Sequence, residues 1–489
     1  MNPAPLQIGW AQADITPEQF PVLVSGQFHA RVSEGVDDPL SATVLVLEEG
    51  GEQVIFVSLD LVCIPNDLRD GVRERVAARG VPGIEPGKII LHATHTHAGP
   101  EVRSPDPLLG GTTAAGTSGV DLGEVPVQVY HTFLCERVAQ TVIRAWETRE
   151  PGTVAWGIDY AVIGRNRRWV DGAGVSTMYG LNRESAPRFR HIEGYEDHSL
   201  NLLATYDAQG NLSGMIVNIP SPSQESEQHY RLSADFWCET RRELRRRFGD
   251  SLFILPQCST AGDLTSHRIM EKRANERMQR LRNRSEREEI ALRIADAVGR
   301  ILPVIATERT GQTGLRHQVR SLPLPLNALK EEDVAAALEE AATLRKQYEE
   351  EKARLEADPS LREKPRWYIR ATFAYRRMKW LEGVKNRFEQ MKEHPTLPVE
   401  VHAVALADIA FASNPFEYYV DYGMQIKLRS PATQTFLIQL AGGGTYVPSP
   451  RSVQGGGYGS VPASNPVGPE GGQKLAEETV CLLKSLIPA

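Results

Sequence analysis

The motif Thr94-His95-Thr96-His97 places two imidazoles two residues apart, directly after an apolar run (residues 88–93) that is typical of a buried strand. If the chain is extended there, both side chains point the same way. Imidazole is the side chain that most often binds metals in proteins, and it also exchanges protons near neutral pH. A pair of hydrogen-bonded structural histidines would show the same pattern. The motif therefore indicates either a metal site or a structural pair.

Polar side chains also follow four other segments that we expect to be strands. They are Gln224, Glu227 and His229 after residues 215–219, Asp263 and Thr265 after residues 252–255, Glu417 after residues 408–412, and Tyr446 after residues 435–440. Ligands of open α/β sheets bind beyond the carboxyl ends of the strands, so we expect these groups to converge. Each also has a structural interpretation, because aspartate after glycine is common in turns and glutamate can cap a helix.

Strands and helices alternate along much of the chain. Residues 53–59 and 88–93 read as strands on either side of a helix over residues 66–78, and the alternation recurs over residues 215–255. Such strand–helix–strand units favour parallel pairing. We therefore predict an α/β fold with a mixed, largely parallel sheet, flanking helices, and a site at the carboxyl ends of the strands. No internal repeat is evident, and residues 1–489 are expected to form one domain.

Two regions differ from this pattern. Residues 329–393 are dense in Glu, Lys, Arg and Ala, which predicts a charged helical hairpin inserted into the domain, with helices over Glu331–Ala357 and Pro365–Lys392. The hairpin could be a solvated insertion, a lid, or an arm that forms a homo-oligomer. Residues 104–123 are rich in Gly, Ser, Thr and Pro and predict a long loop, either a lid or a disordered segment.

Bulk composition excludes several classes of function. The formal net charge is -7, which argues against a nucleic-acid partner. The five cysteines are odd in number and widely spaced, which fits a reducing compartment. The sequence contains no run of about 18 apolar residues, so no transmembrane helix is expected, and the N-terminus lacks a signal-peptide pattern. We expect a cytoplasmic protein that acts on a small molecule.

Several short motifs, taken in order, resemble one family. They are IGWAQADITP (residues 8–17), VSLD ending at Asp60, ATHTHAGP (93–100), Asn166-Arg167, SADF (233–236), AGDLT (261–265), PFE (415–417) and TYVPS (445–449). Together they resemble the N-terminal catalytic domain of the neutral, non-lysosomal ceramidases, with THTH-x-GP as the most specific element. The resemblance implies an amide hydrolase that uses one divalent metal, zinc in the family.

The resemblance also implies roles for individual residues. It assigns metal binding to His95, Glu417 and Tyr446, catalysis to His97 and Thr265, and substrate binding to Asn166 and Arg167. Asp263 could be a metal ligand or a turn residue, and we place it with the catalytic residues, where it would orient a histidine or the loop. The stretch that carries the family's second ligand histidine contains no histidine here. His229, Glu227 and Gln224 are the alternatives for that ligand. A carboxylate or amide there would shift the preference from zinc toward manganese or magnesium.

These observations favour a metal-dependent hydrolase that cleaves an amide (N-acyl) bond by attack of metal-activated water. The many polar groups at the strand ends favour a substrate more polar than ceramide, such as a lipid-like or sugar-linked amide or ester. Two alternatives remain open. One is a carbohydrate-active lyase or hydrolase that uses the same metal site, and the other is a non-catalytic binding or assembly protein on this fold.

Overall fold

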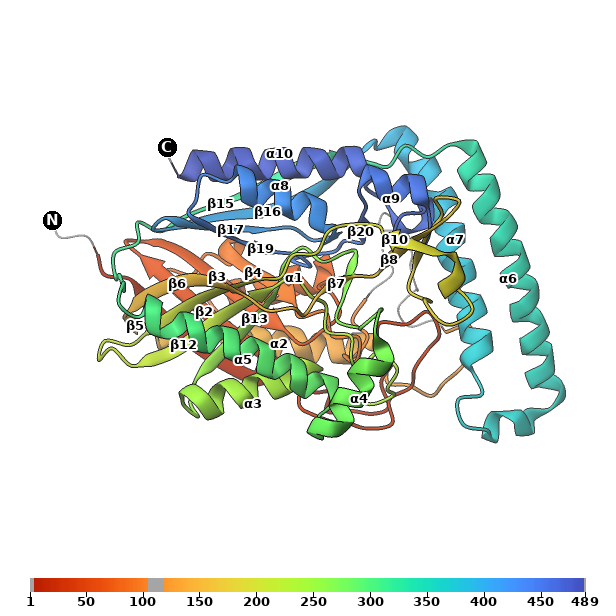
Figure 1. Ribbon diagram of the computed structural model, residues 1–489, viewed down its shortest axis with the longest axis horizontal. Helices are drawn as coiled ribbons and strands as arrows, with labels where there is room; N and C mark the ends of the chain where they lie inside the picture. The colour runs from red at the N-terminus through yellow and green to blue at the C-terminus, as the bar shows by residue number, and fades with distance from the viewer. Residues whose placement is uncertain (1–3, 104–117, 488–489) are drawn as a thin grey trace.

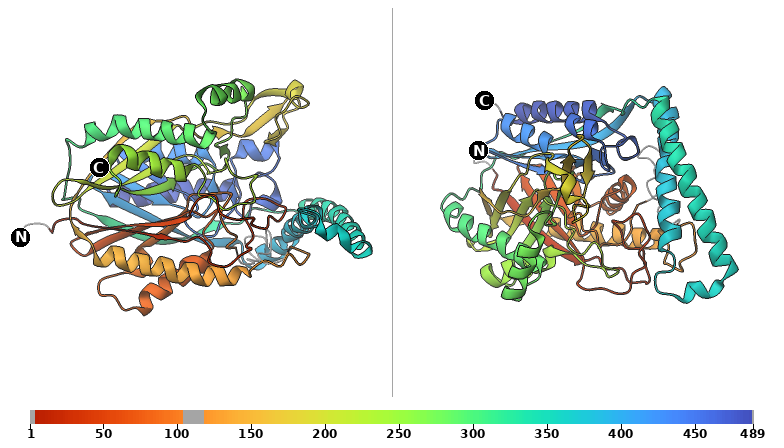
Figure 2. Two further views of the ribbon diagram at one scale, coloured as in Figure 1. Left: turned by 90° about the horizontal axis from the view of Figure 1, so that it is seen from below. Right: turned by 45° about the vertical axis from the view of Figure 1, so that its right-hand side comes forward.

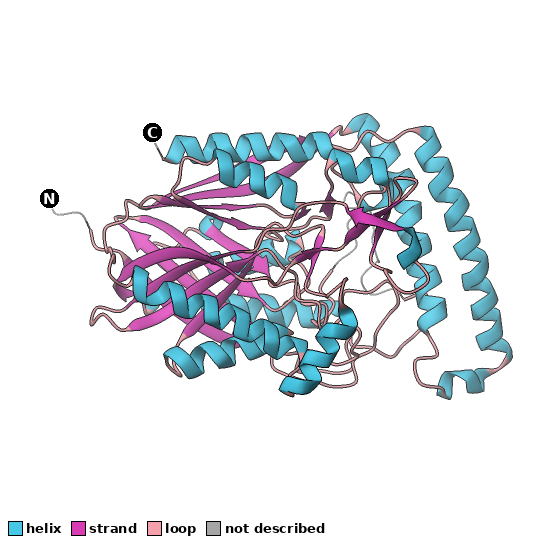
Figure 3. Cartoon of the chain, in the orientation of Figure 1, coloured by secondary structure: helices cyan, strands magenta, loops and turns pink. Residues whose placement is uncertain are grey.

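The computed structural model describes residues 4–103 and 118–487. Residues 104–117 of the expected long loop lie outside this part, and residues 118–123 contain no helix or strand. The mixed α/β class is confirmed, since strands fill the interior and most helices lie outside them (Figure 3). Within the described residues, no helix is long and apolar enough to cross a membrane.

The larger sheets are built from three units with the same strand order. Unit 1 comprises β1 (Gln7–Asp14), β2 (Ser41–Glu49), β3 (Glu52–Leu59), α1 (Asn66–Ala78) and β4 (Ile89–Ala93). Unit 2 comprises β6 (Thr153–Tyr160), β11 (Ser199–Tyr206), β12 (Leu212–Ile219), α3 (Phe236–Phe248) and β13 (Phe253–Cys258). Unit 3 comprises β15 (Arg316–Pro325), β16 (Thr396–Leu406), β17 (Ile409–Ser413), α8 (Val420–Arg429) and β19 (Gln434–Ile438).

The expectation of a largely parallel sheet is wrong. In each unit the first three strands pair antiparallel, and only the last pair, β3–β4, β12–β13 or β17–β19, is parallel. The length of the connections accounts for one antiparallel pair and the parallel pair in each unit. Short turns join β2 to β3, β11 to β12 and β16 to β17, and a short turn permits only antiparallel pairing. A helix crosses over between the last two strands of each unit, and only this crossover allows a parallel pair.

The three sheets meet face to face in a shared core. One apolar cluster contains strand residues of all three units, including Phe56 of unit 1, Leu203 of unit 2 and Phe411 of unit 3. The ring centroids of Phe56 and Phe411 are 5.0 Å apart, and those of Phe411 and Phe436 are 4.5 Å apart. The outer faces are covered by helices, so the central strands are buried on both sides. This explains their nearly continuous apolar runs.

A long helix follows each unit and packs on the outer face of that unit's sheet (Figure 1). These helices are α2 (Val127–Glu147), α5 (Glu286–Ile305) and α10 (Pro469–Leu486). Between β15 and β16, α6 (Glu331–Ala357) and α7 (Ile369–Glu393) pack side by side. They form an arm at the end of the molecule away from both termini (Figure 2). We call α6 and α7 the arm.

Short elements complete the structure and carry much of the site. They are β5 (Glu150–Pro151), β7 (Arg165–Asn166), β8 (Arg168–Asp171), β9 (Ser176–Met178), β10 (Phe189–Ile192), β14 (Leu264–Thr265), α4 (Lys272–Arg282), β18 (Glu417–Tyr418), β20 (Tyr446–Val447) and α9 (Pro450–Gly455). The 3₁₀ turns are η1 (Pro86–Lys88), η2 (Ala186–Arg188), η3 (Pro359–Glu363) and η4 (Pro462–Ser464).

Candidate active site

The candidate residues lie at the carboxyl ends of the last two strands of each unit. His95 and His97 follow β4 in unit 1, Gln224 follows β12 in unit 2, and Glu417 and Tyr446 follow β17 and β19 in unit 3. Backbone pairing joins these ends. Thr96 bridges to Ser223, and β18 pairs with β20 so that Glu417 lies beside Tyr446. The site is therefore assembled from all three units.

The orientation of His95 is fixed by its backbone and one hydrogen bond. Its φ is 61°, so the chain turns here through the left-handed region and is not extended as the sequence suggested. Nδ1 lies 2.6 Å from the carbonyl oxygen of Val62. A carbonyl can only accept, so Nδ1 carries a proton, and Nε2 is the ring nitrogen that faces the site. That atom lies 3.3 Å from Glu417 Oε2 and 3.3 Å from His97 Nε2.

His97 is oriented by Glu227. The Glu227 carboxylate lies 3.3 Å from His97 Nδ1, a long contact whose alignment is poor. Burial lowers the pKa of His97 to about 4, so its imidazole is neutral at neutral pH. With the Nδ1 proton directed at Glu227, Nε2 is the basic atom. Gln224 Nε2 lies 3.2 Å from it and can donate to it.

Glu227 also contacts a residue that the sequence did not single out, His267. Glu227 Oε1 lies 2.9 Å from His267 Nε2, and Glu225 lies 3.6 Å from His267 Nδ1. Burial alone would raise the pKa of Glu227, but hydrogen bonds from His267 and His97 hold it well below its usual range. Burial alone would lower the pKa of His267, but the neighbouring carboxylates of Glu225 and Glu227 raise it to about 11. A protonated His267 thus holds the carboxylate that orients His97.

Arg167 supplies a buried positive charge on the other side of the site. Its NH2 donates to the Tyr446 hydroxyl (3.2 Å) and to the Gly262 carbonyl (2.8 Å), and lies 3.8 Å from Glu417 Oε2. Its NH1 donates to the Tyr179 hydroxyl at 2.5 Å. Burial would raise the pKa of Glu417, but His95 and Arg167 lower it, so Glu417 is a carboxylate. Arg167 therefore holds two of the predicted metal ligands.

Thr265 and Tyr179 fix the side chain of Gln224. Their hydroxyls lie 2.9 Å and 3.0 Å from Gln224 Oε1. The amide nitrogen of Gln224 is thereby directed at His97. Thr265 thus contacts the site through Gln224, and the sequence contains no local signal that Tyr179 would join it, since Tyr179 comes from the loop after β9.

Two predicted site residues have other partners. Asp263 accepts hydrogen bonds from Asn166 Nδ2 (2.9 Å) and from the Val420 backbone N–H (2.9 Å), so it joins β7 to the start of α8 and orients no histidine. Burial raises the pKa of Asp263 to about 7. His229 is not brought to the cluster. Its side chain is 55% exposed and lies 3.7 Å from Asp37. This leaves Gln224 and Glu227 as the groups nearest the expected second-histidine position.

The donor set can be tested against a metal. Ligands at about 2.0–2.1 Å on tetrahedral zinc lie about 3.3–3.4 Å apart, which matches the separation of His95 Nε2 from Glu417 Oε2. His95 Nε2, His97 Nε2 and the Glu417 carboxylate also face one another, an arrangement that a cation would stabilise. In the described ranges, however, no three His, Cys, Asp or Glu side chains are arranged to hold a metal ion. The residues therefore fit a metal only if oxygens such as the Tyr446 hydroxyl or the Gln224 amide complete the set.

Comparison with known proteins identifies the class to which this fold belongs. No protein-family model matches the chain. The structure superposes on the crystal structure of neutral ceramidase from Pseudomonas aeruginosa with a TM-score of 0.66 and 18% identity, over 99% of this chain and 75% of that chain. A structure described as ceramidase complexed with C2 gives a TM-score of 0.66 and 17% identity, with the same coverage. The chain therefore has the ceramidase fold.

In sequence, the chain is 25% identical to neutral ceramidase of Pseudomonas aeruginosa over 236 residues. The matched segment covers 46% of this chain and 31% of that protein's length. The resemblance inferred from the short motifs is thus confirmed, and the protein is a divergent, ceramidase-like chain.

Proposed function

We propose that this protein is a hydrolase that cleaves an amide (N-acyl) bond. The observation that carries the proposal is the convergence at one point of His95, His97, Glu417 and Tyr446, from strand ends of units 1 and 3, with Arg167 from the segment between β7 and β8. The fold supports it, because the similar proteins are named for cleaving ceramide, an N-acylated lipid.

The chain supplies a base and donors for this reaction. Neutral His97 takes a proton from water through Nε2 as the water oxygen adds to the amide carbon. Arg167 and the Tyr446 hydroxyl are positioned to donate to the oxyanion that forms. Glu227 stabilises the resulting His97 imidazolium. The imidazolium then returns its proton to the leaving nitrogen, the carbon–nitrogen bond breaks, and a carboxylic acid and an amine are released.

We further propose that a divalent metal, zinc or alternatively manganese or magnesium, belongs to this site. His95, Glu417 and Tyr446 would hold it, with Gln224 nearest the place of the family's second histidine. A metal there would polarise the substrate carbonyl and lower the pKa of a water molecule. His95 and Arg167 lower the pKa of Glu417, which keeps its carboxylate ionised and available as a ligand.

The proposed substrate is more polar than ceramide. Buried charged and amide side chains surround the reacting groups, among them Arg167, Gln224 and Glu227. Polar groups of a substrate could be hydrogen-bonded here, whereas a purely apolar substrate would leave these side chains without compensation for lost water.

Release of free amine from N-acyl compounds tests the hydrolase. The wild-type chain, supplied in turn with zinc, manganese and magnesium, should release amine from at least one member of a panel that varies in headgroup polarity. His97→Ala should abolish the release. His229→Ala is the matched control, because it removes an exposed imidazole outside the cluster and should leave the rate unchanged. Failure of the wild type on every member would refute the proposed activity.

Elemental analysis tests the metal separately. Wild-type protein should carry about one equivalent of a divalent metal, and both His95→Ala and Glu417→Ala should lose it. His229→Ala should keep it. Metal that persists in both site variants would place it elsewhere, and amine release by chelated, metal-free protein would show that the reaction needs only the side chains.

A further inference from the structure

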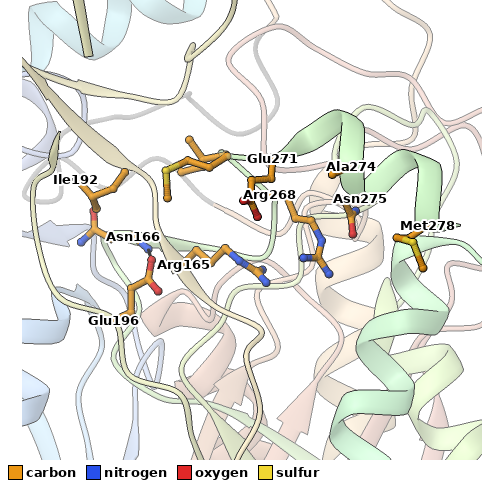
Figure 4. A pocket seen from close by; sticks show the side chains of 11 residues that line it. Arg165, Asn166, Ile192, Glu196, Arg268, Glu271, Ala274, Asn275 and Met278 are labelled. Atoms are coloured by element: carbon orange, nitrogen blue, oxygen red, sulfur yellow. Dashed lines mark hydrogen bonds between the residues drawn. The ribbon is translucent and has the colours of Figure 1, made fainter. Parts of the chain in front are cut away.

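A cavity of about 320 Å³ lies between β7, the loop after β14 and α4. Figure 4 shows the guanidinium groups of Arg165 and Arg268 directed into the same space from two sides. Asn166 and Asn275 add amide groups to the lining, and Met278 adds an apolar wall. The cavity is large enough for a small ionic group and part of the molecule that carries it.

The arginines at this cavity outnumber their carboxylate partners. Arg268 and Arg293 both bond to one carboxylate, Glu286, at 3.2 Å and 3.0 Å. Arg165 has no ion-pair partner anywhere in residues 4–103 or 118–487, and its guanidinium donates only to the Ile163 carbonyl at 3.1 Å. One terminal nitrogen of Arg293 is buried without a hydrogen-bond partner. The group of Arg165, Arg268 and Arg293 therefore has more positive charge than Glu286 balances.

Two acidic residues also line the cavity, and neither forms an ion pair with Arg165 within the described residues. Glu196 accepts from the Asn166 backbone N–H at 3.0 Å and pairs with His198 at 3.2 Å. Glu271 lies at the rim with an exposed side chain. Burial and the nearby charges of Arg268 and Arg293 lower the pKa of Arg165, and the opposing charges of Glu286 and Glu196 do not cancel this effect.

The cavity adjoins the candidate active site. β7 pairs with β14 so that Arg165 lies opposite Thr265, and paired residues on neighbouring strands lie on one face. Thr265 in turn contacts Gln224 at the reacting groups. Arg268 directly follows His267, which holds Glu227. A molecule whose amide reached His97 could thus extend into this cavity.

We propose that the cavity binds an anionic group of the substrate, a carboxylate, sulfonate or phosphate, between Arg165 and Arg268. The planar donor fork of arginine matches such oxyanions in geometry as well as charge. The substrate is then an N-acyl compound whose amine portion carries an acid. This last statement rests on the proposed hydrolase function, whereas the binding of an anion does not.

Binding of inorganic phosphate tests the cavity without any need for turnover. Titration calorimetry on the whole chain at fixed ionic strength should show saturable binding that Arg165→Gln weakens by roughly tenfold or more, as expected when a charged hydrogen bond is lost. Arg190→Gln is the matched control, because Arg190 is an exposed arginine outside the cavity that donates only to nearby carbonyls. Arg165 breaks no ion pair when replaced, so the variant should fold, and a thermal melt checks this. Equal binding by wild type and Arg165→Gln would overturn the site.

Matched substrates test the link to catalysis and identify the anion. N-lauroylglycine, N-lauroyltaurine and N-lauroylethanolamine phosphate present a carboxylate, a sulfonate and a phosphate, and N-lauroylethanolamine is the neutral comparison. At least one anionic compound should have the higher kcat/KM, and Arg165→Gln should reduce that preference by roughly tenfold. Equal kcat/KM for anionic and neutral compounds would overturn the substrate class. If the wild type cleaves none of them yet binds phosphate through Arg165, the hydrolase proposal fails and the anion site stands.

Discussion

Glu227→Gln is the substitution that most directly tests how His97 is oriented. Both His97 and His267 direct an N–H at the Glu227 carboxylate, at 3.3 Å and 2.9 Å. A carboxylate accepts both bonds, whereas an amide of the same shape has one acceptor and one donor. In the variant, one of the two imidazoles would face an NH₂ group. The substitution thus removes a negative charge and one hydrogen-bond acceptor with almost no change in side-chain volume.

The expected loss follows from the distance. Two unit charges 3.3 Å apart interact by about 5 kcal/mol at an effective dielectric constant of about 20. His267 would partly compensate by losing its own proton once Glu227 is neutral, so we expect about 3–4 kcal/mol less stabilisation of the His97 imidazolium. That free energy corresponds to a fall in kcat of roughly 100- to 1,000-fold. KM should change much less, because Glu227 stabilises a charge that exists only during the reaction.

Amine release under saturating substrate measures this effect, and Glu225→Gln is the control. Glu225 lies 3.6 Å from His267 and, within the described residues, forms no ion pair with His97, so the kcat of Glu225→Gln should stay within about threefold of wild type. Elemental analysis of both variants separates a role of Glu227 in orienting His97 from a role in metal binding. A Glu227→Gln chain that keeps kcat within about twofold, or that loses bound metal along with activity, would refute the role of Glu227 in orienting His97.

Three further predictions concern stability. Phe411→Ala should lower the free energy of unfolding by about 3–5 kcal/mol in a urea titration, because its buried ring lies between the three sheets. Arg241→Met should cost about 3–5 kcal/mol in the same assay, since it leaves the fully buried Asp60 carboxylate unpaired at the contact between units 1 and 2. The pKa of His267 is raised to about 11, so its stabilising contribution is complete below its ordinary value of 6.5 and is lost as pH rises toward 11. His267→Ala should therefore flatten the decline of stability over that pH range, measured by thermal melts.

Sequence patterns predicted individual elements better than their pairing. The helix expected over residues 66–78 has those bounds in α1, and the apolar runs are strands. The hairpins were missed although a signal was present, since Gly50-Gly51 between β2 and β3 is a typical two-residue hairpin turn. The shared strand order of the three units leaves no trace in the sequence. Topology can be preserved by apolar patterning alone while the residues themselves diverge.

The candidate site was predictable only where residues follow strands. His95, Glu417 and Tyr446 could be placed near one another because strand ends of one fold meet at a common edge. His267 and Tyr179 could not, because each reaches the site through a contact between loops of different segments. The left-handed backbone conformation of His95 could not be predicted either, since a histidine in the sequence does not by itself indicate a positive φ.

The common core of the three units also constrains how the chain can be made. Its apolar cluster includes strands from β1 through β19, so the inner faces of the first two sheets lack their contacts with unit 3 until the last sheet has been synthesised. A ribosome adds about 5–20 residues per second, which leaves those faces uncovered for many seconds. A nascent chain lacking unit 3 would expose apolar sheet surfaces and would lack the site residues Glu417 and Tyr446. Chaperone protection during translation should therefore matter more for this protein than for one of equal length whose domains fold in turn.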